Sequence, residues 1–279
     1  MPKPVAEIKQ VTLKKFSMAT IASNSIIVLI GKRKGGKSSL VLDFLSYHTD
    51  IPVAMVISPT DEFNHTFRGV IPEIFIHHEF NPTALNTFLK RQQEKTKRSQ
   101  IDGSDPRALL ILDDIMGEDD SWSRDSTIKW LFLNGRHVNV TLVVALQDVI
   151  GLPPKMRNNT DYIFICKQTN RIGRERIYRM FAGVFDNIQL FEHTMLHCCD
   201  DYRCLVIDNT SQSYNLEDQV FWYKADINRA KSAKVCHPKY WELNDELKLV
   251  EKDSEDKPEN IKNCYNRASG QTFVIRRLE

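Results

Sequence analysis

A glycine-rich octapeptide, Gly31-Lys-Arg-Lys-Gly-Gly-Lys-Ser38, constrains the fold of this chain more than any other feature. It follows the apolar run Ile26–Ile30, which is typical of a strand buried on both faces. It opens the segment Ser38–Tyr47, whose apolar residues have helical spacing. The pattern G-x-x-x-x-G-K-[ST] between a strand and a helix is a phosphate-binding loop, or P-loop. The sequence therefore predicts that the chain binds a nucleoside triphosphate.

The residues of the P-loop have separate expected roles. Its glycines let the backbone curl so that successive N–H groups point at the phosphates, and the following helix N-terminus adds positive potential. Lys37 is expected to reach the β- and γ-phosphates, and Ser38 to offer its hydroxyl to Mg²⁺. The expected phosphate-binding set is Gly31, Gly35, Gly36, Lys37, Ser38 and Ser39.

Two adjacent carboxylates close a second buried strand. The apolar run Ala108–Leu112 ends at Asp113 and Asp114. Asp113 can hold Mg²⁺ through water beside Ser38, and Asp114 can polarise or position the water that attacks the γ-phosphate. The alternative is that both carboxylates only cap the strand before a turn. Because the sequence contains no N-K-x-D guanine motif, ATP is favoured over GTP.

A third polar residue, Gln147, ends the predicted strand Val138–Leu146. In a parallel sheet the carboxyl ends of the strands meet at one edge, so Gln147 is expected near the P-loop and Asp113. There it can sense the γ-phosphate or orient the attacking water. Alternatively, it only closes the strand.

Strand and helix patterns alternate along the chain. This alternation predicts an α/β fold in which a mostly parallel sheet carries helices on both faces. The further predicted strands are Val53–Ile57, Tyr162–Cys166 and Cys204–Ile207, and the further predicted helices are Pro82–Arg98, Asp125–Leu133 and Arg174–Phe181. We expect residues 1–20 to form an N-terminal arm, residues 21–244 a P-loop ATPase domain, and residues 245–279 a charged C-terminal tail.

The composition narrows the class of protein. The 279 residues include 38 Lys+Arg and 36 Asp+Glu, a formal net charge of +2, so any contact with nucleic acid must come from local basic patches. The longest apolar stretches have the length of strands and the start has no apolar signal-peptide core, so we expect neither a transmembrane segment nor secretion. Six cysteines without regular spacing fit a reducing compartment.

Beyond the P-loop, the stretch Asn134–Gln147 is similar to the genome-packaging ATPases of the nucleocytoplasmic large DNA viruses, together with Ile111–Asp114 before it and Pro153–Asp161 after it. That family belongs to the FtsK/HerA superfamily of P-loop DNA-pumping ATPases. The resemblance covers residues 26 to 207. It implies a RecA-like core and a homo-oligomeric ring, expected to be a hexamer, that drives double-stranded DNA into a capsid by ATP hydrolysis. It also implies a place in the host cytoplasm, at the viral factory, or in the virion, with capsid or inner-membrane proteins as further partners.

The resemblance also gives roles to individual residues. Lys37 and Ser38 take the places that bind phosphate and Mg²⁺, and Asp113 takes the place that supports Mg²⁺. Asp114 takes the place of the catalytic carboxylate, and Gln147 that of the sensor. Many members of the wider FtsK/HerA group carry glutamate where Asp114 stands, so the shorter side chain needs a bridging water or a closer geometry.

Two arginines are candidates for the cation that a neighbouring subunit supplies to the transferring phosphoryl group in ring motors. Arg136 and Arg157 both lie in loops that flank the strand ending at Gln147. Arg157 is favoured because it follows a Pro-Pro loop. For each arginine, an ordinary ion pair or a helix-end contact is the alternative.

Basic residues also gather on two predicted helices. Arg171, Arg174 and Arg179 can share one helix face and follow DNA phosphates without sequence specificity. The alternative is a solvated helix face, and the segment Lys90–Arg98 has the same two interpretations.

A cluster of histidines and cysteines follows these arginines. His193 and His197 are one helical turn apart, and Cys198, Cys199 and Cys204 lie close by in the sequence. No paired C-x-x-C spacing accompanies them, and cysteine is most often a small buried apolar residue. We therefore predict no metal site there.

Two other functions remain open from the sequence. A nucleotide or nucleoside kinase would use the Arg171–Arg179 cluster as a phosphate-clamping lid, and an assembly ATPase would act on protein. The Asp113–Asp114 pair, followed by a polar sensor on a later strand, favours a hydrolase over a kinase. Stimulation by DNA would separate a DNA motor from an assembly ATPase.

Overall fold

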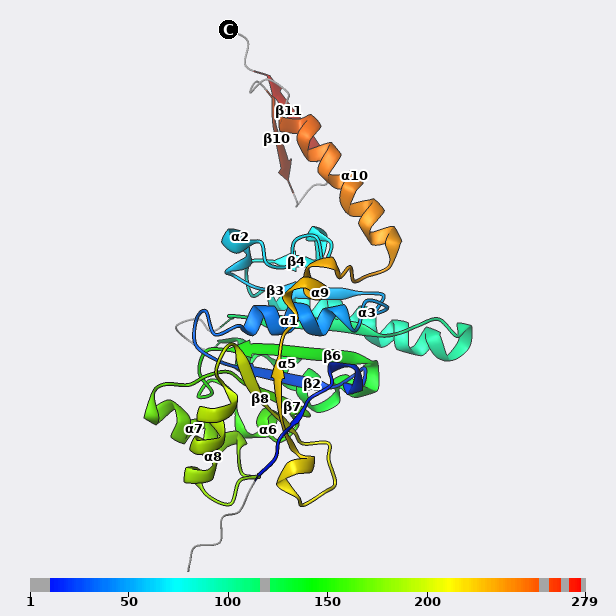
Figure 1. Cartoon of the computed structure of the whole chain (residues 1–279). Helices are drawn as coiled ribbons and strands as arrows, with labels where there is room; N and C mark the ends of the chain where they lie inside the picture. The colour runs from blue at the N-terminus through cyan, green and yellow to red at the C-terminus, as the bar shows by residue number, and fades with distance from the viewer. Residues whose placement is uncertain (1–10, 116–120, 256–260, 267–270, 277–279) are drawn as a thin grey trace, which may run out of the picture. The chain divides into compact units, whose positions relative to one another are not determined.

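The computed structural model describes residues 11–115, 121–255, 261–266 and 271–276 (Figure 1). The chain divides into two units, Met1–His237 and Pro238–Glu279, whereas the sequence analysis placed the end of the ATPase domain at residue 244. The second unit contains α10 (Pro238–Glu255) and an antiparallel hairpin of β10 (Ile261–Asn266) and β11 (Gln271–Arg276). Among the described residues we find no helix with the length and apolar character that a membrane span needs.

The first unit is built on a nine-stranded sheet with the order β1-β9-β8-β7-β2-β6-β5-β3-β4. The six strands from β7 to β4 are parallel, β8 is antiparallel to both β7 and β9, and the short β1 runs parallel to β9. The predicted α/β fold with a mostly parallel sheet is therefore confirmed. The strands are β1 (Lys14–Lys15), β2 (Ile26–Ile30), β3 (Ala54–Ile57), β4 (Ile76–His77), β5 (Ala108–Asp113), β6 (Val140–Leu146), β7 (Tyr162–Ile165), β8 (Arg203–Asp208) and β9 (Val220–Lys224).

Helices cover both faces of this sheet. The helix α1 leads from β2 to β3 in one direction along the sheet, whereas α3, α5 and α6 connect strands in the opposite direction, so right-handed crossovers put them on opposite faces. In agreement, α1 packs with α9, and α5 packs with α3 and α6 (Figure 1). The helices of the first unit are α1 (Lys37–Ser46), α2 (Asp61–Asn64), α3 (Pro82–Asp102), α4 (Ser121–Arg124), α5 (Ser126–Asn134), α6 (Pro154–Arg157), α7 (Arg171–Phe181), α8 (Ile188–Cys198) and α9 (Ile227–Ser232).

The core lies between the central strands and these helices. Every residue of β2, β3, β5 and β6 is buried, which explains why the sequence shows continuous apolar runs there and not an alternating pattern. Side-chain caps fix where several helices start. The Asn81 side chain accepts from the backbone N–H groups of Thr83 and Ala84 at the start of α3, and α3 ends at Gly103, whose φ is 66°.

Some elements differ from the sequence prediction. Part of the predicted arm belongs to the core, because β1 joins the sheet and the side chains of Phe16 and Met18 are buried. The strand predicted from Val138 starts at Val140, because residues 135–138 form a 3-10 turn that ends at Asn139 with a φ of +55°. The helix predicted from Arg174 starts three residues earlier, at Arg171, where the side chain of Asn170 caps it.

Candidate nucleotide-binding and hydrolysis site

The parallel strands bring the predicted functional residues to one edge of the sheet. In the register of the sheet, Ile30 at the end of β2 lies opposite both Leu146 of β6 and Ile165 of β7. Asp113 lies opposite Ala145 in the same way. The P-loop, Asp113 and the segment that begins at Gln147 therefore all follow strand ends at this edge, as a doubly wound sheet requires.

The backbone of the P-loop depends on two of its glycines. Gly36 caps α1 with a φ of 90°, a conformation that side chains with a Cβ rarely adopt. Gly31 lies so close to the residue that follows β7 that a Cβ added to it would be 2.7 Å from the Cβ of Cys166. Within the loop, the backbone N–H of Gly35 donates to the carbonyl of Lys32 over 3.1 Å. The result is a tight curl that opens directly into α1.

Lys37 is held inside this curl. Its side chain is buried, and Nζ donates to the carbonyl oxygens of Gly31 at 2.6 Å and Lys32 at 3.2 Å. Burial lowers the pKa of Lys37, while the negative charges of Asp114 and Asp113 act in the opposite direction. Lys37 lines the same cavity as both carboxylates and begins the helix that carries Ser38 and Ser39.

The two aspartates have different surroundings. Asp113 is buried, and this burial, followed by the charge of Asp114, raises its pKa to about 6, while the charge of Lys37 and a hydrogen bond from Ser58 oppose the rise. Asp114 is half-buried and has a left-handed backbone with a φ of +54°. The carboxylate of Asp114 accepts a hydrogen bond from Nε2 of Gln147. The predicted catalytic carboxylate and the predicted sensor are thus in direct contact.

These residues line one cavity of about 550 Å³, which we call the acidic cavity. Its lining is Arg33, Lys34, Lys37, Ser38, Thr60, Phe63, Asn64, Asp113, Asp114 and Gln147. The oxygen atoms of Ser38, Asp113 and Asp114 are the type of ligand that Mg²⁺ prefers, so the residues present fit a magnesium–nucleotide complex.

The sequence analysis missed the residues that follow β3. Thr60 and Asn64 line the acidic cavity, and buried Asp61 acts on the pKa of Asp113 while its Oδ1 accepts from the backbone N–H of Phe67 over 2.9 Å. A signal was present, because the predicted strand Val53–Ile57 ends in this polar segment at the same edge of the sheet.

A second cavity, of about 590 Å³, lies on the other side of the P-loop, and we call it the aromatic cavity. Its lining is Lys34, Gly35, Gly36, Lys37, Ser38, Ser39, Tyr202, Lys224, Ala225 and Ile227. The last four lie just before β8, at the end of β9, in the link after β9 and at the start of α9, and no sequence motif marks them.

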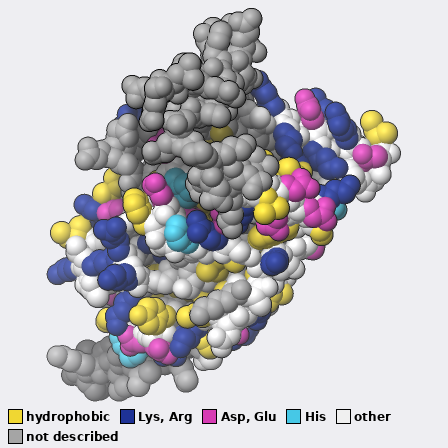
Figure 2. Space-filling model, turned by 90° about the horizontal axis from the view of Figure 1, so that it is seen from above, with side chains coloured by type: hydrophobic (Ala, Val, Ile, Leu, Met, Phe, Trp, Pro, Cys, Tyr) yellow, Lys and Arg dark blue, Asp and Glu magenta, His cyan; other side chains and the backbone are white. Residues whose placement is uncertain are grey.

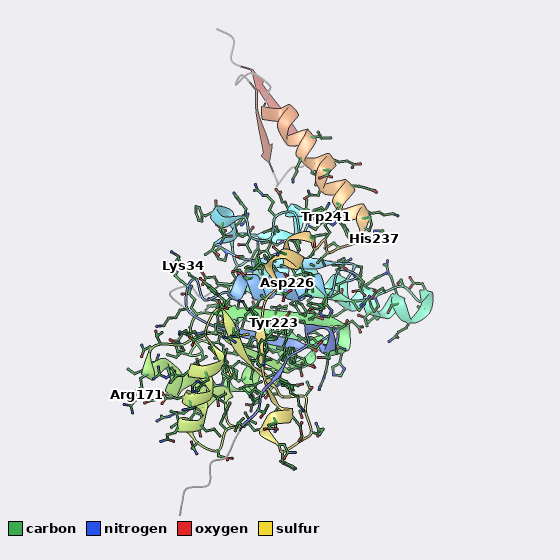
Figure 3. All side chains as sticks on the ribbon, in the orientation of Figure 1. Lys34, Arg171, Tyr223, Asp226, His237 and Trp241 are labelled. Atoms are coloured by element: carbon green, nitrogen blue, oxygen red, sulfur yellow. The ribbon has the colours of Figure 1, made fainter. Side chains whose placement is uncertain are left out.

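A buried polar network holds α9 against α1. Asp43 of α1 is fully buried, and its carboxylate accepts hydrogen bonds from the Tyr223 hydroxyl at 2.5 Å and from Nη2 of Arg229 at 2.8 Å. The Arg229 guanidinium also stacks on the ring of Tyr47, 4.1 Å from its centroid. Tyr223 lies at the centre of the first unit (Figure 3). This network, missed by the sequence analysis, fixes one wall of the aromatic cavity.

The structure places the two candidate arginines outside both cavities of this chain. Arg136 lies in the turn before β6, and its charge acts on Asp161, whose Oδ2 accepts from the first backbone N–H of β2 over 2.7 Å. It is therefore at the amino edge of the sheet, opposite the P-loop. Nη1 of Arg157 donates to the carbonyl of Leu152 over 2.7 Å.

The arginines of α7 differ from one another in their contacts. Arg174 forms an ion pair of 2.8 Å with Glu192 of α8 and is 17% exposed, so the structure uses it to join two helices. Arg171 pairs with Glu175 over 3.0 Å and is largely exposed. For Arg179 the described part of the chain shows no ion pair. Of the three arginines expected to share one face, Arg174 is thus tied to α8, and Arg171 and Arg179 stay candidates for contact with DNA.

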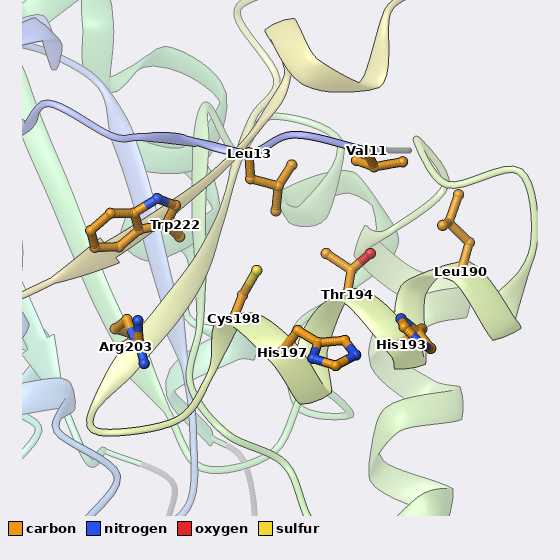
Figure 4. Close-up of a pocket in the computed structure, with 9 residues that line it drawn as sticks. All are labelled: Val11, Leu13, Leu190, His193, Thr194, His197, Cys198, Arg203 and Trp222. Atoms are coloured by element: carbon orange, nitrogen blue, oxygen red, sulfur yellow. The ribbon is translucent and has the colours of Figure 1, made fainter. Parts of the chain in front are cut away.

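Three members of the histidine and cysteine cluster, His193, His197 and Cys198, line a separate pocket of about 430 Å³ (Figure 4), whereas Cys199 and Cys204 are buried and do not line it. The rings of His193 and His197 are 4.4 Å apart. Over the described residues, no group of three or more His, Cys, Asp or Glu side chains is arranged to hold a metal ion. The pocket lining is Val11, Leu13, Leu190, His193, Thr194, His197, Cys198, Arg203 and Trp222.

Known viral proteins match most of this chain. Relatives include an uncharacterised protein of Acanthamoeba polyphaga mimivirus, 34% identical over 82% of this chain and 84% of the relative. Another is an uncharacterised protein of Frog virus 3, 35% identical over 85% of this chain and 74% of the relative.

Solved structures support the fold. B204, the DNA-packaging ATPase of Sulfolobus turreted icosahedral virus, is 15% identical with a TM-score of 0.50, over 74% of this chain and 100% of that one. The pCW3 conjugation coupling protein TcpA is 13% identical with a TM-score of 0.50, over 82% of this chain and 66% of that one. The family model of the Poxvirus A32 protein matches residues 13–234. The chain therefore belongs to the Poxvirus A32 protein family, and it is a P-loop ATPase.

Proposed function

We propose that this ATPase is a motor that moves double-stranded viral genomic DNA into a capsid. The observation that carries the hydrolytic part is the contact between Gln147 and Asp114 in a cavity that also contains Lys37 and Ser38. The packaging part is supported by the membership of the Poxvirus A32 family and by the described role of B204 as a DNA-packaging ATPase.

The chemistry follows from the positions of these side chains. Magnesium, when bound, neutralises charge on the β- and γ-phosphates, and Ser38 and Asp113 are the residues that would hold it. Lys37 binds the phosphates from inside the P-loop. Asp114 orients the attacking water and accepts its proton, while the amide of Gln147 fixes the Asp114 carboxylate.

We extend the proposal to a ring of identical subunits. The acidic cavity contains Arg33, Lys34 and Lys37, of which only Lys37 is buried. An arginine from a neighbouring subunit, Arg157 or Arg136, would add the cation that stabilises charge on the transferring phosphoryl group. A ring is expected to work in the host cytoplasm or in the virion, with capsid or inner-membrane proteins as its docking partners.

DNA would contact basic side chains outside the two cavities. Lys and Arg side chains gather at the end of the molecule formed by α3 and again at the opposite end (Figure 2). The exposed members outside the cavities are Lys90, Lys97 and Arg98 of α3 and Arg171 of α7, and exposed Lys34 of the P-loop lies at the rim that the two cavities share. Lys34 and Arg171 lie on the same side of the first unit (Figure 3). Such contacts bind phosphates without reading the sequence of the DNA.

Steady-state ATP hydrolysis with and without linear double-stranded DNA, at two salt concentrations, tests the proposal. We expect stimulation by DNA that weakens at the higher salt concentration, and its absence in Lys37→Ala. A rate of hydrolysis that does not change when DNA is added would contradict the proposal of a DNA motor and favour an ATPase that acts on protein. Phosphate transfer to a nucleoside or nucleotide acceptor would instead favour a kinase.

A further inference from the structure

The two cavities beside the P-loop share one wall and differ in the rest. Lys34, Lys37 and Ser38 line both. The acidic cavity adds Asp113, Asp114 and Gln147, which suit the γ-phosphate and the attacking water. A nucleoside triphosphate whose phosphates lie on the P-loop therefore has its opposite end, the ribose and the base, at the aromatic cavity.

The aromatic cavity offers apolar surface for a flat ring. Tyr202 is 71% exposed and Ile227 is 55% exposed, and both line the cavity. A Cβ added to Gly36 would be 3.6 Å from Cδ1 of Tyr202, so the tyrosine ring lies directly beside the P-loop. The cavity volume of about 590 Å³ is within the range of small-molecule sites.

The turn that carries Tyr202 is strained. Asp201 and Tyr202 have consecutive left-handed backbones, with φ values of +53° and +57°. Non-glycine residues hold such angles when surrounding contacts enforce them, often where a side chain is aimed at a ligand. Here Asp201 pairs with Lys224 over 2.7 Å, and Asp200 pairs with Lys167 over 2.5 Å. Two ion pairs thus hold a bulky aromatic residue in a conformation that it would otherwise avoid.

From this geometry we infer that Tyr202 stacks on the base of the bound nucleotide, with Ile227 as a second apolar contact in the same cavity. The ligand class is a purine nucleoside triphosphate, because a two-ring base gives the larger stacking area. This inference rests on the proposed function, since it places the triphosphate on the P-loop. It assigns to Tyr202 a role in nucleotide affinity and none in the chemical step.

Isothermal titration of the full chain with Mg²⁺ and two probes, a non-hydrolysable ATP analogue and inorganic tripolyphosphate, tests the inference. Tyr202→Ala is expected to weaken binding of the analogue by roughly 5- to 150-fold, the range for loss of one base–aromatic stack. Its affinity for tripolyphosphate should equal that of the wild type. Tyr202→Phe should keep the wild-type affinity for both probes, because it keeps the ring.

Two further variants protect the test from effects on folding. Tyr202→Asn also removes the ring, but asparagine tolerates a left-handed backbone, so this variant should fold at least as stably as the wild type and still bind the analogue weakly. Tyr214→Ala removes a fully exposed tyrosine from a different cavity and should change neither affinity.

The outcomes separate this inference from the proposed function. Wild-type affinity for the analogue in Tyr202→Ala and Tyr202→Asn would overturn the inference, as would an equal loss for both probes. If the wild type binds neither probe, or if Lys37→Ala binds both normally, the P-loop site itself is wrong and the inference falls with it.

Discussion

The acidic and the aromatic cavities lie on either side of the P-loop, have similar volumes, and differ in chemistry. The acidic cavity is formed by residues at the ends of parallel strands, and the Asp114 carboxylate in it contacts the amide of Gln147. The aromatic cavity is closed by the antiparallel part of the sheet and by α9, through Tyr202 and Ile227. We therefore expect the acidic cavity to serve hydrolysis and the aromatic cavity to serve nucleotide binding. Changes in the acidic cavity should reduce turnover, and changes around the aromatic cavity should reduce affinity.

The largest expected effect is that of Asp114→Asn, which should lower turnover without changing the affinity for ATP. Loss of a general base that positions water lowers kcat by about 10²–10⁴-fold, whereas the affinity for ATP should stay within about threefold of the wild type. Single-turnover hydrolysis and equilibrium binding, measured on the same preparation, check both values. Loss of binding in this variant would show that Asp114 holds the nucleotide instead of acting on water.

On the aromatic side, Asp43→Ala should destabilise the fold. The variant leaves the Tyr223 hydroxyl and the Arg229 guanidinium without their buried acceptor, and because Arg229 is 38% exposed, water offsets part of the cost. We expect a loss of about 2–3 kcal/mol in the free energy of unfolding, measured by urea denaturation. Arg229→Ala should cost more, because it leaves the Asp43 charge uncompensated. Similar stability of both variants and the wild type would contradict this account of the network.

The burial of Asp113 in the acidic cavity should make the free energy of unfolding depend on pH. Burial, followed by Asp114, raises the pKa of Asp113 to about 6, whereas the carboxyl of the unfolded chain ionises near pH 4. The folded state therefore binds more protons between these values, and its stability falls as the pH rises through this window. Asp113→Asn should gain about 1–3 kcal/mol of unfolding free energy at pH 7.5 and nothing near pH 4, without nucleotide or Mg²⁺. Denaturant titrations at both pH values measure the gain. An equal gain at both would show that the raised pKa of Asp113 is not its cause.

The smallest effect is expected outside both cavities, on α7. Replacing both Arg171 and Arg179 by Gln should weaken stimulation by double-stranded DNA and lower the salt dependence of DNA binding by roughly one unit of slope per arginine. Fluorescence anisotropy with a duplex at several salt concentrations measures the slope. Lys129→Gln, an exposed change on α5, is the matched control. A slope equal to that of the control would remove α7 from the DNA surface.

The acidic cavity was largely predictable from the sequence. The P-loop, Asp113 and Gln147 each follow or end a continuous apolar run, and strands of that kind lie parallel with their carboxyl ends together. The sheet was predictable for the same reason. The polar residues after β3 were missed because they match no motif, although they follow an apolar run in the same way.

The aromatic cavity could not be found in this way. Its residues meet the P-loop through contacts that span most of the chain, such as the pair of Asp43 and Arg229, which are 186 residues apart. Nothing local marks Tyr202 as a functional residue, because a strained turn is visible only in the backbone angles. The ion pair of Arg174 could not be predicted for the same reason, because its partner Glu192 is on α8, a helix that the sequence analysis did not predict.

The network around Asp43 has a consequence for movement. It joins α1, whose first turn we propose to bind the phosphates, to α9, which lines the aromatic cavity. If α1 and α9 slid past one another, the buried carboxylate of Asp43 would lose its hydrogen bond from Arg229. The two helices must therefore move as one rigid body. The residues proposed to contact the base and the phosphates would then move together. Any opening of the nucleotide site must therefore come from movement of the opposite wall, where Gln147 and the residues after β3 lie.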